Sequence, residues 1–426
     1  MSFTQHLRAA LEAQLGGVAD AQRRKAAFAA FEDLGLPTRR DEEWRYTPLA
    51  ALSGHRWGAP RAQSLRPDEL ARHQTPGAVA RFVFVDGSLH AAASRLEPVA
   101  GLTLSHLRAD AAGRPQVAEA DLVGDLERPR SGVDALHEAL AFDGAIIEVA
   151  ANTELEGVIE IVHVAADPES VAAHRHIVRL GHHARATLVE RYVATSEAAA
   201  AAFLRVNGTT IDVGAGAALH HIRLQREARG ACAFYADDVA TRRDGAYRRV
   251  TVSLGARVAR ETLTIRVNEP GAHTDIAALY VPKQGQLIDH HTCIDHRAPA
   301  CTADQLYKGI LDGDGAAVFN GKIFVRQAAQ QTAAEQLNQN LMLSRDATCD
   351  TKPQLEIFAD DVRCTHGATV GQLSPEEMFY LMSRAIPEPA ARRMLVHGFA
   401  ETVLERVAAE DVARELREQL DEHLAA

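Results

Sequence analysis

The stretch from Thr332 to Gly371 reads TAAEQLNQNLMLSRDATCDTKPQLEIFADDVRCTHGATVG. It combines polar amides, β-type apolar runs and one Cys-x-His pair within about three strand lengths. Near its end, Val362, Cys364 and His366 are two residues apart, so in a strand their side chains would project from one face. A thiol and an imidazole side by side suit a soft or borderline metal, or a site shared across an interface. The stretch predicts β structure and makes Cys364 and His366 candidate site residues.

The residues before this stretch predict a long series of strands. From Ala145 to Val325, apolar β-type segments begin roughly 11–17 residues apart and are joined by short Gly, Asp or Asn turns. These segments are too numerous for one sandwich of ordinary size. A parallel β-helix accommodates them because each coil stacks on the previous one and like side chains form ladders. We therefore predict a mainly β fold with a parallel β-helix core; a pair of sandwiches is the alternative. The amides expected to form ladders are Gln330, Gln331, Gln336, Asn338, Gln339 and Asn340.

Both ends of the chain predict α-helices. In the first 50 residues, apolar side chains recur at helical spacing, as Leu7, Leu11 and Leu15 do. Further on, Ser374-Pro375-Glu376-Glu377 is typical of a helix start, with Ser as the N-cap and Pro at the first helical position. We predict an N-terminal helical and mixed region (1–140), a β-helix core (141–373) and a C-terminal helical domain (374–426). Before the core, Trp44 and Tyr46 are expected to clip an N-terminal arm onto the main body.

Composition indicates an ordinary globular protein of 426 residues, with 46% apolar and 24% charged residues. The net charge of −11 argues against a general nucleic-acid or anionic-membrane surface. No apolar run approaches the length of a membrane span, and the N-terminus shows no secretory signal. The five cysteines are few and odd in number, which favours reduced thiols in the cytoplasm. The sequence assigns no role to four of them: Cys232, Cys293, Cys301 and Cys349.

Common nucleotide and hydrolase motifs are absent from the sequence. The stretch GDGAAVFNGKI (313–323) fails as a phosphate loop because Ala316 and Ile323 stand where Gly and Ser or Thr are required. Gly214-x-Gly216 has Leu219 in place of the third glycine of a dinucleotide fingerprint. No GxSxG occurs. The sequence therefore predicts neither a bound nucleotide nor a self-contained hydrolase site.

Two histidine-containing segments remain as metal-site candidates. In DHHTCIDH (289–296), the strand period puts His291, Cys293 and Asp295 on one face and His290 and His296 on the other. No CxxC or HExxH pattern is present, so we expect a structural polar ladder there. Cys364 and His366 are too few ligands for a closed site. If they are functional, a second chain must complete the set; the alternative is a buried thiol beside a hydrogen-bonded imidazole.

Six segments together resemble the SufD family, the non-ATPase partners in SufB–SufC–SufD iron–sulfur cluster assembly complexes. The resemblance covers nearly the whole chain and is weakest between about 51 and 140. It fits SufD better than its paralogue SufB. The segments are EEWRYTPL (42–49), DHHTCIDH (289–296), QLYKGIL (305–311), FNGKIFV (319–325), NQNLMLS (338–344) and KPQLEIFADDVRCTHGATVG (352–371).

The resemblance implies a right-handed parallel β-helix flanked by helical regions and a scaffold role without enzymatic activity. It implies pairing with a SufB-like subunit through the terminal part of the β body, and docking of a SufC-like ATPase by the C-terminal helices. His366 matches the histidine that acts with a SufB cysteine at that interface, and Cys364 matches the neighbouring motif cysteine. Iron or an iron–sulfur cluster would be held there transiently, with no permanent cofactor. A homodimer in the absence of SufB, a flavin in the complex and a part in iron acquisition stay open.

Two other classes of function compete with this interpretation. Many parallel β-helices act on carbohydrate, but such an enzyme needs clustered acids and aromatic platforms. Only Asp360-Asp361 forms an adjacent acid pair in the final strands, and aromatic residues make up 5% of the chain. The third possibility is a self-associating structural β-helix without a site.

Overall fold

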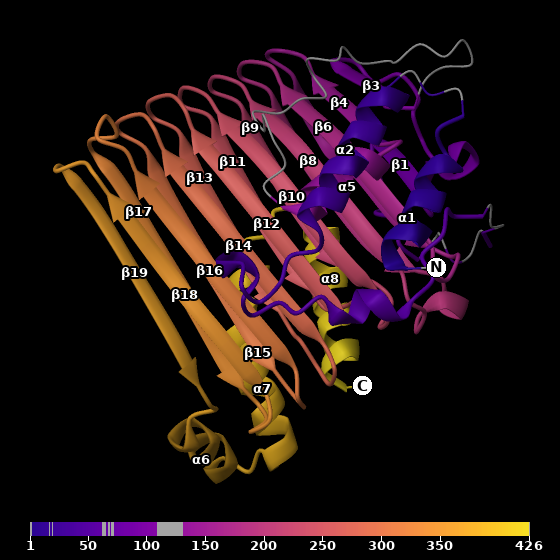
Figure 1. Cartoon of the computed structure of the whole chain (residues 1–426). Helices are drawn as coiled ribbons and strands as arrows, with labels where there is room; N and C mark the ends of the chain where they lie inside the picture. The colour runs from indigo at the N-terminus through magenta and orange to yellow at the C-terminus, as the bar shows by residue number, and fades with distance from the viewer. Residues whose placement is uncertain are drawn as a thin grey trace.

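The computed structural model describes the chain except residues 1, 17, 19, 62–64, 67–68, 70–71, 109–130 and 426. Two long sheets dominate it, and their strands alternate along the sequence (Figure 1). We call them the odd sheet and the even sheet. The odd sheet contains β1 (Ala80–Val85), β2 (Ser88–Leu89), β5 (Glu154–Ala165), β7 (Arg185–Ala194), β9 (Ala218–Gln225), β11 (Ala246–Ser253), β13 (His273–Tyr280), β15 (Thr302–Leu311), β17 (Thr332–Met342) and β19 (Val362–Gly371).

The even sheet is built in the same way. It contains β3 (Leu102–His106), β4 (Ala145–Val149), β6 (Val171–Leu180), β8 (Leu204–Val213), β10 (Cys232–Thr241), β12 (Val258–Val267), β14 (Leu287–His296), β16 (Ala316–Val325) and β18 (Thr348–Ile357). From β4 onward, the strand pairs recorded in the described residues are parallel and join every second strand of the sequence. This alternation is a parallel β-helix, so the predicted architecture is confirmed and the sandwich alternative is wrong.

The first strands lie before the core boundary predicted from the sequence. β1 pairs in parallel with β5, and β3 pairs antiparallel with β4. The turn at Asp86 and Gly87 joins β1 to β2, and both residues have positive φ, 45° and 95°. A two-residue hairpin turn with positive φ at both positions favours Asp-Gly. The sheets therefore reach back into the region between 80 and 106.

Helices cover the outer faces of the two sheets (Figure 1). Over the even sheet lie α1 (Phe3–Glu12), α2 (Ala21–Leu34) and α5 (Gly132–Leu140), which share an apolar cluster with Leu204, Val206 and Phe234. Over the odd sheet lie α7 (Glu388–Leu404) and α8 (Glu410–Ala425). Short 3-10 turns complete the set: η1 (Glu42–Trp44), η2 (Ala50–Gly54), η3 (Ala91–Ala93) and η4 (Ser196–Ala198).

The helix α6 (Pro375–Ser383) follows the last strand. Ser374 caps it by accepting a hydrogen bond from the Glu377 backbone, and Pro375 is its first residue, as predicted. The sequence predicts that the apolar face of the next helix holds Met394, Leu395, Phe399, Val403, Leu404 and Val407. This prediction is partly wrong, because Met394 is 52% exposed. Val396 and Ala400 pack against the odd sheet instead. The helical period was right, but the apolar residues of α7 are more than one face can bury.

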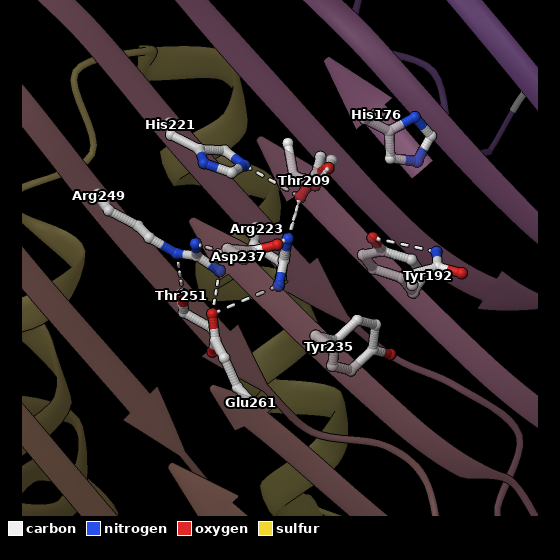
Figure 2. Close-up of polar contacts among 12 residues, drawn as sticks. His176, Tyr192, Thr209, His221, Arg223, Tyr235, Asp237, Arg249, Thr251 and Glu261 are labelled. Atoms are coloured by element: carbon white, nitrogen blue, oxygen red, sulfur yellow. Dashed lines mark hydrogen bonds and ion pairs between the residues drawn. The ribbon is translucent and has the colours of Figure 1, made fainter. Parts of the chain in front are cut away.

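The interior of the β-helix is apolar along much of its length and strongly polar in its middle rungs. Arg223 on β9 and Arg249 on β11 are buried between the sheets (Figure 2). Arg223 Nη2 lies 2.5 Å from Glu190 and 2.8 Å from Asp237, and Arg249 Nη1 lies 2.7 Å from Asp237. Arg249 also pairs with Glu261. Buried charges are tolerated when they are paired in this way, so the cluster reads as structural.

Candidate functional site

The last rung of the β-helix is formed by β18 and β19, and one edge of each strand is open. β19 pairs with β17 and β18 pairs with β16, and each strand is the last of its sheet (Figure 1). Apolar side chains are exposed at this end: Ile357 by 40%, Phe358 by 58% and Val370 by 51%. An uncovered strand edge with apolar neighbours can pair with another chain.

The two candidate site residues lie on β19. Val362 and Cys364 pack against the apolar cluster of the interior, and His366 follows two residues later on the same inward face. The single face predicted for these three residues is therefore confirmed. Cys364 is half-buried, whereas His366 is exposed because no further rung covers it. Burial raises the pKa of the Cys364 thiol, against a smaller lowering by the Ala334 backbone. The isolated chain thus holds Cys364 as a neutral thiol.

A second thiol lies in the same rung on the opposite sheet. Cys349 on β18 also packs against the interior, and burial raises its pKa to about 12. Among the described residues, however, no group of three or more His, Cys, Asp or Glu side chains is arranged to hold a metal ion. Any metal or cluster at this rung would need ligands from elsewhere.

The segment DHHTCIDH forms β14, and the side chains on its two faces have different surroundings. His290 and His296 are buried in the interior. On the outer face, His291 bridges two carboxylates, with Nε2 at 3.0 Å from Asp289 and Nδ1 at 3.2 Å from Glu43. The structural role expected for this segment therefore takes the form of a clamp on the N-terminal arm. Trp44 of that arm is buried with Arg260 3.8 Å from its ring centre, whereas Tyr46 is exposed.

A cleft of about 620 Å³ lies between this arm, the start of α5 and the even sheet. Cys293 lines it, together with Lys322 and Arg260. Lys322 and Arg260 already form ion pairs within the chain, Lys322 with Glu356 and Arg260 with Asp289. This cleft could not be predicted from the sequence, because its walls come from segments far apart in the chain.

Two family models together match most of this chain. The SUF system FeS cluster assembly SufBD core domain matches residues 163–399, and the SufBD protein N-terminal region matches residues 2–161. The chain belongs to the SufBD family.

Curated relatives agree with this assignment. An iron–sulfur cluster assembly SufBD family protein of Synechocystis sp. is 31% identical over 418 residues, covering 96% of this chain and 92% of the relative. The iron–sulfur cluster assembly protein SufD of Escherichia coli is 32% identical over 394 residues, covering 92% and 90%. SufD of Bacillus subtilis is 28% identical over 285 residues, covering 66% and 64%. The resemblance to SufD is thereby confirmed, and the chain is an iron–sulfur cluster assembly protein of this family. No helix in the described ranges combines the length and hydropathy needed to cross a bilayer.

Proposed function

We propose that this chain is a cytoplasmic, non-ATPase scaffold subunit of a SUF assembly complex. It pairs with a SufB-like subunit across the open rung of β18 and β19 and contributes His366, with Cys364 beside it, to a shared cluster-building site. A SufC-like ATPase docks on the C-terminal helices. The chain holds iron or a cluster only transiently and has no turnover of its own.

One observation carries the proposal: His366 is exposed at a strand edge that no element of the described residues covers. Its rung also exposes Ile357, Phe358 and Val370. Strand edges that face solvent are commonly blunted by charges or proline. β18 carries such residues, Lys352 and Pro353, but β19, which holds His366, has no proline and Arg363 as its one Asp, Glu, Lys or Arg residue. Imidazole and thiolate are both competent iron ligands, and a site divided between two chains can open to release its product. The lack of a complete ligand set in the described residues fits a site completed by the partner.

The experiment is anaerobic reconstitution of the full chain with SufB-like and SufC-like subunits. Cluster yield is read from absorbance and from iron and sulfide content. His366→Ala is expected to lower the yield roughly tenfold or more, because removing even a residue that only supports a metal ligand typically costs that much. His182→Ala, an exposed histidine in the turn after β6, is the control and should leave the yield unchanged. An unchanged yield in His366→Ala, with the complex intact by mass, contradicts the proposal.

A further inference from the structure

Gln336 on β17 has its amide group fixed by a chain of hydrogen bonds in the interior. Its Nε2 donates to Oε1 of Gln305 at 2.8 Å, and Nε2 of Gln305 donates to the hydroxyl of Thr292 at 2.6 Å. All three residues are buried. These two hydrogen bonds fix the orientation of both amide groups and leave the side-chain carbonyl oxygen of Gln336 without a partner in the series.

That oxygen is buried and has no hydrogen-bond partner among the described residues. Buried side-chain oxygens are almost always bonded, so one that is not calls for an explanation. The next strand supplies a donor, because β17 and β19 pair in parallel with Gln336 directly beside His366. Adjacent strands lie about 4.8 Å apart and paired residues share a face, which brings an imidazole N–H within reach of the amide.

The opposite sheet leaves room for this amide at a glycine. A Cβ at Gly321, in the middle of β16, would lie 2.5 Å from Nε2 of Gln336. Glycine within a strand often marks a close approach by another group. Gly321 belongs to the FNGKIFV segment and Gln305 to the QLYKGIL segment. Two of the segments that resemble the family therefore meet at the Gln336 side chain.

We infer that Gln336 is the positioning residue for His366. When the partner covers the last rung, His366 donates one ring N–H to Oε1 of Gln336, and its other ring nitrogen is left without a proton and directed to the shared site. A ligand histidine commonly donates its second nitrogen to an oxygen acceptor, which fixes both the tautomer and the ring orientation. This inference rests on the proposed function of His366.

The test compares four variants in the reconstituted complex. Gln336→Leu keeps the approximate size but removes the acceptor, and is expected to lower cluster yield roughly tenfold. Gln336→Glu keeps an acceptor, because Gln305 can turn its amide to donate to the carboxylate, and is expected to restore most of the yield. Gln339→Leu makes the same change on the opposite face of β17 and should have no effect. Thr292→Val removes the hydroxyl that accepts the last of these hydrogen bonds, so both amide groups can rotate. A partial loss of cluster yield is expected, although Gln336 and His366 themselves are unchanged.

The outcomes separate the inference from the function on which it rests. If His366→Ala retains full yield, the proposed function fails. If His366→Ala loses yield while Gln336→Leu behaves like Gln339→Leu, the function stands and the positioning role is overturned. Equal losses of cluster yield in Gln336→Leu and Gln336→Glu also overturn the positioning role, because the loss would then not come from removing the hydrogen-bond acceptor. Should Gln336→Leu fail to assemble, Thr292→Val decides: a partial loss supports the inference and full yield overturns it.

Discussion

Asp289 is the residue on which the N-terminal arm depends. Its carboxylate is fully buried, accepts hydrogen bonds from Arg260 Nη1 at 2.9 Å and from the Thr47 hydroxyl, and pairs with His291 Nε2 at 3.0 Å. Burial alone would raise its pKa, but His291 and Arg260 outweigh that effect and hold it at about 2. The carboxylate is therefore charged at neutral pH, and its three partners come from β12, β14 and the arm.

Replacing Asp289 with Ala is expected to lower the free energy of unfolding by about 3–5 kcal/mol, because Arg260 then stays buried without its carboxylate. Urea denaturation measures the change, and limited proteolysis should show earlier cleavage within Glu42–Leu49. The control is Asp212→Ala, which removes a largely exposed pair with Arg242 and should cost no more than about 1 kcal/mol. Equal effects of the two variants would contradict the clamp.

The same clamp predicts a pH dependence through His291. Burial lowers its pKa, but Asp289 and Glu43 more than compensate, so the folded value lies above the ordinary 6.5. A raised pKa means that the contribution is fully present below 6.5 and is lost as the pH rises through the folded value. The difference in unfolding free energy between the wild type and His291→Gln should therefore shrink above about pH 7. A difference that is constant from pH 6 to pH 9 would show that the charge of His291 does not hold the arm.

At the scale of elements, the sequence predicted most strands but missed β10: it indicated no strand between ALHHIRL (218–224) and YRRVTVSL (247–254). Its centre, Asp237-Asp238, is unfavourable in a strand, and nothing nearby compensates for it. Asp237 faces inward to Arg223 and Arg249, whereas Asp238 faces outward to Arg266. Those arginines belong to β9, β11 and β12, so the compensation appears only when the rungs stack. A signal of this kind cannot be read from local periodicity.

The candidate site was predictable for the opposite reason. Cys364 and His366 are two residues apart on one strand, and the strand period alone puts them on one face. The amide ladder was partly predictable: Gln336, Asn338 and Asn340 are buried inside, whereas Gln331 lies in a turn with φ of 60°. The part played by Gln305 and Thr292 was not, because they reach Gln336 only across strands and between the two sheets.

Helix α6 buries none of its residues against the rest of the chain. Its Phe379 and Tyr380 are 73% and 55% exposed. By contrast, α7 and α8 cover the odd sheet, so deleting the whole C-terminal domain would also expose the core. The surplus apolar surface of the C-terminal helices is therefore concentrated on α6.

Changing Phe379 and Tyr380 together to Ser is expected to abolish co-purification with the proposed SufC-like ATPase. Thermal stability should change little, because neither side chain is buried in the chain itself. Pull-down from co-expression and a melting curve measure the two effects. Leu34→Ser, at an exposed apolar residue of α2, is the matched control and should retain the ATPase. Full retention by the α6 double variant would rule this helix out as the docking element.

At the scale of the molecule, the β-helix is a stack in which each rung contacts only its neighbours. Stability in such a stack is approximately a sum over rungs and their interfaces. The Arg223 cluster joins β7, β9, β10, β11 and β12 through Glu190, Asp237, Arg249 and Glu261, so it concentrates paired charges in the middle of the stack (Figure 2). The open rung with His366 lies several strands beyond it. The two regions should therefore respond separately to substitution.

Arg223→Met is expected to destabilise the middle rungs of the β-helix and to leave the rungs near its C-terminal end unaffected. Glu190 loses its guanidinium partner in the interior, and removing one member of a buried pair typically costs about 3–5 kcal/mol. Amide hydrogen exchange should accelerate in β7 to β12, while β15 and β17 keep their protection. Arg242→Met, which breaks an exposed pair, should leave both regions protected. Acceleration of equal size in β9 and β17 would mean that the β-helix opens as a single unit, and the local role of the cluster would then be wrong.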